Sequence, residues 1–154
     1  MSVTAYRIVK PIHAGNAFDG EGARRYGGRW NNKGTPVVYL AGSLALAALE
    51  LLVHLESEQI LSDYVSIGVA FDSEQMILLP KNQYPEDWRD YPAPASTRAI
   101  GDSWFRSKDS LILKIQSAII PGEYNFLLNP LHRDFAKLSI GQPRSFSCDD
   151  RLIK

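Results

Sequence analysis

The sequence contains one cysteine, Cys148, and no long hydrophobic run. A single thiol excludes an intrachain disulfide, and nothing around Cys148 has the spacing of a metal site. The longest apolar stretch, 44–55, includes Glu50 and His54 and is too short to span a bilayer. The first seven residues reach a charge before any apolar run, which is unlike a signal peptide. We therefore expect a cytoplasmic protein without a membrane segment.

The chain also has no excess of either charge, because 17 basic residues balance 17 acidic ones. Such a protein has no overall attraction to phosphate backbones, so we do not expect direct nucleic-acid binding. The three histidines lack zinc-ligand spacing and the chain has no Gly-x-Ser-x-Gly motif, so we expect no metal site and set serine-hydrolase chemistry aside. The length of 154 residues and a hydrophobic content of 45% indicate a single globular domain over residues 1–154.

Short apolar segments with strand character are spread along the whole chain. We expect strands at 6–9, 36–41, 64–71, 111–115 and 124–128, with edge strands within 135–140 and 144–152. Helices are expected from Leu44 to about Glu58, after an N-cap at Ser43, and from Ser96 to about Phe105. The strands do not alternate regularly with helices, which predicts an α+β fold of mostly antiparallel strands rather than a doubly wound sheet.

Glu50 is an unusual residue for its position in an apolar helix. Helical spacing places it on one face with Leu46, Ala47 and Val53, where a carboxylate would be desolvated. Either Glu50 belongs to a functional site, or it lies at the helix margin or pairs with a structural arginine. The sequence leaves both interpretations open.

The segment 15–34 is a glycine-rich loop with six glycines and several basic residues. Within it, Gly27 and Gly28 allow the backbone to approach a ligand closely, and Arg29 offers planar donors that suit a phosphate or a carboxylate. A solvated turn with surface arginines is the alternative. Tyr39 ends a strand just before the Glu50 helix, and its ring has either a core or a stacking role. The hydroxyl of Ser117 suits either local backbone bonding or a ligand.

Taken together, these motifs resemble the RES-domain family, which is named for an arginine, a glutamate and a serine. The resemblance starts at Arg7 and continues through Gly-Gly-Arg29-Trp-Asn, Ala-Leu-Glu50 and Ser117-Ala-Ile-Ile-Pro. It ends in Asn125-Phe-Leu-Leu-Asn-Pro-Leu-His. The order and spacing of these motifs are similar to those of the family over nearly the whole chain.

The resemblance implies a fold like that of ADP-ribosyltransferases of the diphtheria-toxin kind, with a split sheet around a cleft and flanking helices. It implies the toxin of a type II toxin–antitoxin system, which degrades NAD by hydrolysis or phosphorolysis of the nicotinamide–ribose bond. NAD is then a substrate and no cofactor is expected. The implied partner is a helix-turn-helix antitoxin of the Xre type, and a homodimer within the complex is compatible with it. A transferase that modifies a protein and a non-catalytic nucleotide-binding module remain as alternatives.

The resemblance also assigns roles to residues. Glu50 would stabilise positive charge on the ribose, Tyr39 would stack on nicotinamide, and Arg29 would anchor the diphosphate, with all three facing one pocket. Arg7 would bind the same end of NAD, Ser117 would donate a hydrogen bond to the substrate, and Asn125 would shape the pocket.

Overall fold

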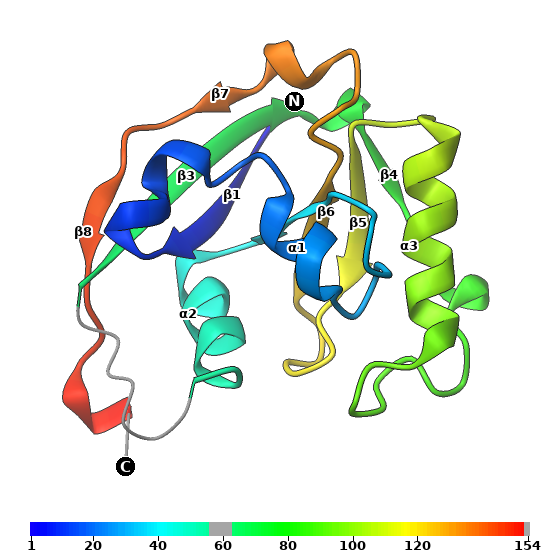
Figure 1. Ribbon diagram of the computed structural model, residues 1–154, viewed down its shortest axis with the longest axis horizontal. Coiled ribbons are helices and arrows are strands. Elements are labelled where there is room, and N and C mark those ends of the chain that lie inside the picture. Colours follow the sequence, from blue (N-terminus) through cyan, green and yellow to red (C-terminus); the bar gives the residue numbers. More distant parts are fainter. Residues whose placement is uncertain (56–62, 153–154) are drawn as a thin grey trace.

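The computed structural model describes residues 1–55 and 63–152. Its strands form a curled eight-stranded sheet in the order β4-β5-β6-β2-β1-β3-β7, with β8 also paired to β3 (Figure 1). The strands are β1 (Ser2–Val9), β2 (Val38–Ala41), β3 (Tyr64–Asp72), β4 (Met76–Leu78), β5 (Ile112–Gln116), β6 (Tyr124–Leu128), β7 (Ser139–Ile140) and β8 (Arg144–Phe146). The α-helices are α1 (Glu21–Tyr26), α2 (Leu44–Leu52) and α3 (Ala95–Ser107), and 3-10 helices span Pro11–Asn16, Ser73–Gln75, Lys81–Gln83, Phe135–Lys137 and Asp150–Leu152. None of the helices in this part of the chain is long and apolar enough to cross a membrane.

The sheet divides between β1 and β2. These two strands share one register pair, Tyr6 with Ala41, whereas β1 and β3 are paired from Ser2–Asp72 to Val9–Val65. The strands β4, β5, β6 and β2 therefore form one half of the sheet, and β1, β3, β7 and β8 form the other. Among the described strands, β4 and β5 are parallel and the other pairs are antiparallel. The predicted α+β fold with mostly antiparallel strands is confirmed.

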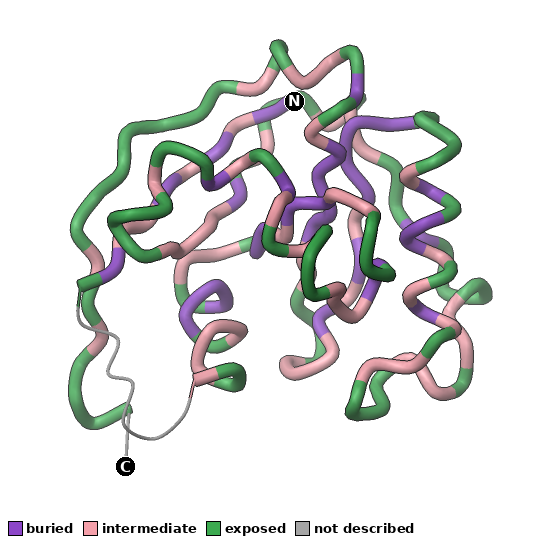
Figure 2. The backbone as a smooth tube through the Cα atoms, viewed as in Figure 1, coloured by how far each residue is buried: buried purple, intermediate pink, exposed green. Residues whose placement is uncertain are grey.

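Buried residues lie along the strands of the sheet and in α2 and α3 (Figure 2), and their apolar side chains form three clusters. Ala5 belongs to a cluster that packs against Phe18 and Phe135, whereas its neighbour Tyr6 packs in a cluster that contains Leu46 of α2. Adjacent residues of a strand point to opposite faces, so α2 lies on the face opposite to Phe18 and Phe135. A third cluster joins α3 to β5 and β6 through Trp104, Leu113 and Leu127.

Several predicted elements form with nearly the expected bounds. The strand expected at 64–71 is β3, and the strand expected at 124–128 is β6. Ser43 is the N-cap of α2 as expected, since its Oγ accepts a hydrogen bond from the backbone N–H of Leu46 at 3.0 Å. The helix predicted from Leu44 to about Glu58 ends at Leu52, and residues 56–58 lie outside the described part of the chain.

Other expectations were wrong in detail. The segment 15–34 is interrupted by the short helix α1, in which Glu21 forms i,i+3 and i,i+4 ion pairs with Arg24 and Arg25. Ser96 is not the N-cap of α3, because Pro94 precedes the helix and the Ser96 hydroxyl donates to Asp87. The edge strands β7 and β8 are shorter than expected, and β4 was not predicted because three residues show no clear alternation.

Candidate active site

Glu50 is held by two side chains from distant parts of the sequence. The Ser117 hydroxyl and the Asn125 amide donate hydrogen bonds to Glu50 Oε1 at 2.8 and 2.6 Å. Ser117 follows β5, Asn125 lies in β6 and Glu50 lies in the second half of α2, so three elements meet here. Both bonds go to one carboxylate oxygen. The other oxygen, Oε2, has no hydrogen bond to any residue that the structure describes.

The connection from β2 to α2 places Glu50 beside Asn125. Ala41, the last residue of β2, is in register with Asn125. The following residue, Gly42, donates its backbone N–H to the Tyr124 carbonyl at 3.0 Å, and a Cβ at Gly42 would lie only 2.9 Å from that oxygen. This close approach carries the chain across the start of β6 before Ser43 begins the helix. Glu50, in the second turn of α2, then lies over the start of β6.

Ser117 bonds to local backbone, which is one of the two roles that the sequence left open, and it also donates to Glu50, whereas its contact with a ligand remains a prediction. It is 2% exposed, and its Oγ accepts backbone N–H bonds from Ile119 and Ile120 at 3.2 and 3.1 Å while donating to Glu50. Glu50 itself is half-buried, and no ion pair to it is present in residues 1–55 and 63–152. The interpretation of Glu50 as the partner of a structural arginine is therefore not supported within the described chain.

Tyr39 is fixed through its hydroxyl to the glycine-rich loop. Its Oη donates to Asn31 Oδ1 at 2.6 Å and accepts the backbone N–H of Trp30 at 3.0 Å. Burial raises the pKa of this hydroxyl well above its usual value, so the phenol stays neutral at physiological pH. A Cβ at Gly28 would lie 2.6 Å from Tyr39 Oη, which explains the glycine at this position. Stacking of the ring on nicotinamide remains a prediction.

Arg7 lies where the two halves of the sheet divide. Its Nη1 donates to the backbone carbonyl of Tyr39 at 3.2 Å, so a side chain of β1 bonds to β2 close to their single register pair. Burial lowers the pKa of the guanidinium, and the nearby charge of Asp19 opposes that effect. Two buried side-chain atoms of the described residues lack a hydrogen-bond partner, Arg7 Nε and Asn125 Oδ1. Unpaired buried polar groups are costly, and both belong to residues predicted to bind the substrate.

Arg29 reaches a different segment from Glu50. Its Nη1 donates to the backbone carbonyls of Trp88 and Asp90 at 2.9 and 2.8 Å, and no hydrogen bond or ion pair with Glu50 is present in the described structure. The structure therefore brings Glu50, Ser117 and Asn125 together by hydrogen bonds, and none of these bonds includes Arg29.

The segment 84–90 bridges these two groups, a role that the sequence pattern did not predict. Arg89 Nε donates to the carbonyl of Ala118 at 3.3 Å, and Tyr84 Oη accepts the backbone N–H of Gln116 at 2.9 Å. The same segment binds Arg29 through its carbonyls, so it spans from the glycine-rich loop to the residues on either side of Ser117. The only sequence feature that could have indicated this role is the pair of aromatic residues Tyr84 and Trp88, which lie between prolines. The rest of the stretch is typical of a surface loop.

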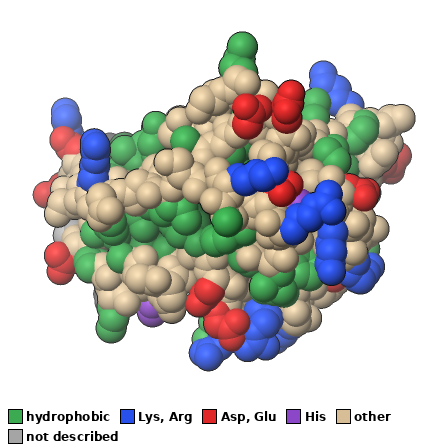
Figure 3. Space-filling view, turned by 90° about the horizontal axis from the view of Figure 1, so that it is seen from above, with side chains coloured by type: hydrophobic (Ala, Val, Ile, Leu, Met, Phe, Trp, Pro, Cys, Tyr) green, Lys and Arg blue, Asp and Glu red, His purple; other side chains and the backbone are tan. Residues whose placement is uncertain are grey.

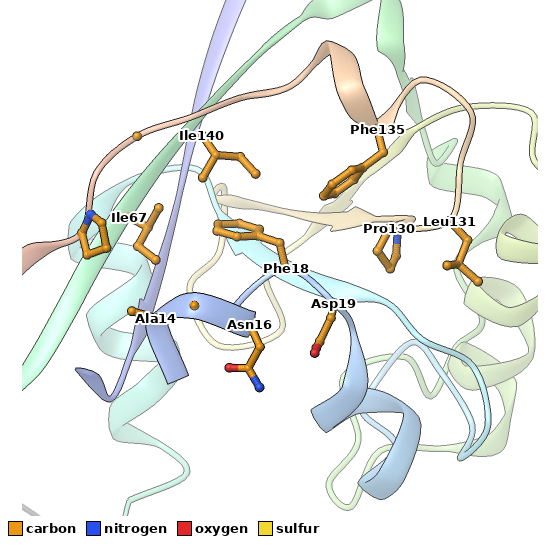
Figure 4. Close-up of a pocket in the computed structure, with 12 residues that line it drawn as sticks. Ala14, Asn16, Phe18, Asp19, Ile67, Pro130, Leu131, Phe135 and Ile140 are labelled. Atoms are coloured by element: carbon orange, nitrogen blue, oxygen red, sulfur yellow. The ribbon is translucent and has the colours of Figure 1, made fainter. Parts of the chain in front are cut away.

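A large hollow lies on the face of the sheet that carries Phe18. It has a volume of about 530 Å³, and apolar side chains dominate its surface (Figure 3). Phe18, Ile67, Phe135 and Ile140 point into it (Figure 4). A second hollow of about 480 Å³ is polar and is lined by Tyr26, Gly27, Asn31, Asn32, Lys33 and Arg98. Neither hollow is lined by Glu50, Tyr39 or Arg29, so the shared pocket of these three residues stays a prediction.

Comparison with known proteins agrees with the sequence motifs. The family model described as "RES domain" matches residues 4–149. A protein named "Toxin Res" from Yersinia enterocolitica is 43% identical over 96% of this chain and 97% of its own length. The "Prs ADP-ribosylating toxin" of a Sphingobium species is 32% identical over 100% of this chain and 99% of its own.

The fold has a solved counterpart of low sequence identity. In the crystal structure of the M. tuberculosis MbcT-MbcA toxin-antitoxin complex, the matching chain superposes with a TM-score of 0.73 at 18% identity. The match covers 96% of this chain and 85% of the other. At that identity the likeness concerns the fold alone, whereas the family model and the curated relatives establish kinship over almost the whole sequence. The chain belongs to the RES domain family.

Proposed function

We propose that this protein is the toxin of a toxin–antitoxin pair and that it cleaves the nicotinamide–ribose bond of NAD. The observation that supports this reaction most directly is the Glu50 carboxylate, whose Oε1 is fixed by Ser117 and Asn125 while Oε2 has no hydrogen bond to the described residues. The names of the family relatives, toxins in every case, support the cellular role.

The reaction needs stabilisation of a cation rather than protonation of a leaving group. When the bond between ribose C1′ and the nicotinamide nitrogen breaks, the electron pair leaves with the ring, whose cationic nitrogen becomes neutral. No general acid is required, unlike in ordinary glycoside hydrolysis. Positive charge develops on the ribose, and a carboxylate already held in place stabilises it. Water then adds to C1′ and releases a proton, giving ADP-ribose, and inorganic phosphate in its place gives a phosphorylated ADP-ribose.

The other site residues would bind and orient NAD. Arg7 Nε is a buried donor without a partner, and in the described structure Arg29 uses only Nη1 in hydrogen bonds. Both guanidinium groups would donate to the diphosphate, which suits their planar arrangement of donors. Tyr39 would stack on nicotinamide, and Asn125 Oδ1 would accept a hydrogen bond from the substrate. Ser117 would contact NAD or keep Glu50 oriented toward it.

The decisive test is nicotinamide release from NAD by purified protein. The Glu50→Gln variant keeps the size of the side chain and its acceptor oxygen but removes the charge. We expect turnover to fall on the order of 100-fold or more with an unchanged circular dichroism spectrum. Glu74→Gln, at an exposed position, is the matched control and should behave like the wild type. Wild-type rates in Glu50→Gln would refute the assigned role of the carboxylate.

A second candidate function is ADP-ribosylation of a protein, because a relative over the full length is named for that activity. Incubation of cell extract with NAD labelled in the adenylate part separates the alternatives. Label retained on protein indicates a transferase, and free labelled ADP-ribose indicates hydrolysis. A product that appears only when phosphate is added indicates phosphorolysis. A non-catalytic nucleotide-binding module would bind NAD and release no nicotinamide under any of these conditions.

The proposed partner is an antitoxin, of the helix-turn-helix Xre type, that blocks the activity in the cytoplasm. The fold neighbour was solved as a toxin–antitoxin complex, which is consistent with this pairing. Quantification of NAD in cells after induction of the chain, with and without the co-expressed partner, tests the pairing directly. We expect NAD to fall only when the partner is absent. The mass of the purified complex in solution would show whether the toxin dimerises within it.

A further inference from the structure

We propose that Asp102 of α3 is a positioning residue that holds the Arg29 loop and thereby sets the affinity for NAD. The proposal rests on the proposed function, because Arg29 is taken there as an anchor for NAD. Asp102 is 7% exposed. Its Oδ1 accepts the backbone N–H of Asn32 at 3.0 Å, and its Oδ2 accepts from Asn32 Nδ2 at 2.8 Å.

A buried carboxylate is expensive to maintain without a cation beside it. No lysine, arginine or histidine forms an ion pair with Asp102 within the described ranges 1–55 and 63–152. Both of its oxygens instead bind the backbone and the side chain of one loop residue, Asn32. The two hydrogen bonds to Asn32, rather than a neighbouring cation, therefore offset the cost of burying this charge. The same two bonds fix one point of the loop.

The rest of α3 holds the same loop along its length. Thr97 Oγ1 donates to the carbonyl of Arg29 at 2.6 Å. A Cβ at Gly101 would lie 1.6 Å from the carbonyl oxygen of Trp30, so the helix backbone rests directly against the loop. Thr97 and Gly101 are four residues apart and share one face of the helix, and Asp102 directly follows Gly101. They hold Arg29, Trp30 and Asn32 in turn.

On its other side the loop is held by Asn31. The side-chain amide of Asn31 donates to the carbonyls of Ala23, Asn32 and Thr35 at 2.9, 3.1 and 3.1 Å, and its Oδ1 accepts from Tyr39. The loop is thus fixed between α3 and β2. The guanidinium of Arg29 is bonded only to the carbonyls of segment 84–90 in the described structure, so its position depends on where the loop backbone is held.

This arrangement predicts a separation of binding from chemistry. No hydrogen bond in the described structure links the loop 29–32 to Glu50, Ser117 or Asn125. Loosening the Asn32 end of the loop should therefore displace Arg29 and leave the carboxylate in place. If the role of Asp102 were purely structural, its substitution would instead lower the fraction of folded protein. The apparent kcat would then fall and KM would stay unchanged.

The test is a reciprocal exchange of the two partners. In Asp102→Asn, the new amide group opposes the amide of Asn32, and one hydrogen bond is lost. We expect KM for NAD to rise about tenfold, with kcat within about twofold of the wild type. In the double variant Asp102→Asn/Asn32→Asp the donor and acceptor are interchanged. Residue 102 again accepts the backbone N–H, and Arg98 Nε, which donates to Asn32 Oδ1 at 3.1 Å, keeps its acceptor. KM should return to within about threefold of the wild type.

Asp109→Asn, an exposed change of the same chemistry near the end of α3, is the matched control and should leave KM unchanged. The proposal is overturned if folded Asp102→Asn has a wild-type KM, or if the exchange does not restore it.

The dissociation constant of NAD for the same variants, measured by titration calorimetry in a Glu50→Gln background, separates this result from the reaction itself. A wild type that releases no nicotinamide would refute the proposed reaction. A dissociation constant raised by Asp102→Asn and restored by the exchange would still support the loop role, and an unchanged one would refute it.

Discussion

The two faces of the sheet differ in what they offer a ligand. On the face that carries α2, Glu50 meets Ser117 and Asn125 within hydrogen-bond distance. On the opposite face, a hollow of about 530 Å³ is lined mainly by apolar side chains such as Phe18 and Ile140. The first region has converging polar atoms, and the second has space. This apolar hollow is therefore not where Glu50, Ser117 and Asn125 gather.

The difference has a physical reason. Stabilising a developing charge requires groups held in position before the reaction, because reorientation during the reaction would cost much of the benefit. A cluster of short hydrogen bonds meets this requirement even where little open volume is present. An apolar hollow supplies contact area alone. The following substitutions test whether function is confined to the polar region.

The largest effect in this comparison is expected from removing both partners of Glu50. Ser117→Ala and Asn125→Ala should each lower kcat/KM roughly 10- to 100-fold, since a hydrogen bond to a charged group contributes about 1.5 to 3 kcal/mol. The double variant should lose less than the product of the two, because both act on one oxygen. Nicotinamide release measures the effect, with Ser139→Ala, at an exposed position, as the control. Full activity in the double variant would contradict the role of this cluster.

A smaller effect is expected at Arg29. Arg29→Lys retains the charge but cannot reproduce the planar set of donors, so KM for NAD should rise on the order of tenfold. Arg106→Lys, at an exposed position of α3, provides the control. If KM and kcat both stay at wild-type values, Arg29 does not anchor NAD.

A smaller effect still concerns Tyr39 and pH. Because the folded pKa of Tyr39 is raised, the unfolded tyrosine ionises first, so its contribution to stability is complete below about pH 10 and is lost as the pH rises above it. One such proton gives a slope of up to about 1.4 kcal/mol per pH unit. Tyr39→Phe should reduce the alkaline loss of stability, as measured by urea unfolding at pH 9 and pH 11. Tyr26→Phe, 78% exposed in the wild type, should not. Equal alkaline losses in both variants would argue against a buried, neutral Tyr39.

The smallest effect is expected in the apolar hollow. Ile140 is 41% exposed, and Ile140→Ser should change nicotinamide release by no more than about twofold, as for other surface substitutions. Leu131→Ser, 69% exposed in the wild type, gives an independent measure from the far side of the same hollow. A large loss of activity in both folded variants would show that the two faces are not separate in function.

The sequence predicted those strands and helix ends that are determined by neighbouring residues. The alternation in 64–71 predicted β3, and Ser43 was predicted as the N-cap of α2, because side-chain periodicity and capping act over a few residues. The residue pattern also singled out Glu50 and Ser117, and the family resemblance added Asn125, although neither could show that the three residues meet. The segment 84–90 and Asp102 were missed, because their importance comes from contacts with residues more than 25 positions away.

The amino-acid sequence by itself determined the class of fold, the family and the identity of the polar residues in the apolar segments. Tertiary structure alone decided that Glu50 Oε1 is shared by two donors 67 and 75 residues away, and that Arg29 turns toward the carbonyls of Trp88 and Asp90. The reason is that hydrophobic periodicity fixes which side of an element is buried, whereas the partner of a buried polar group depends on which distant elements pack against it.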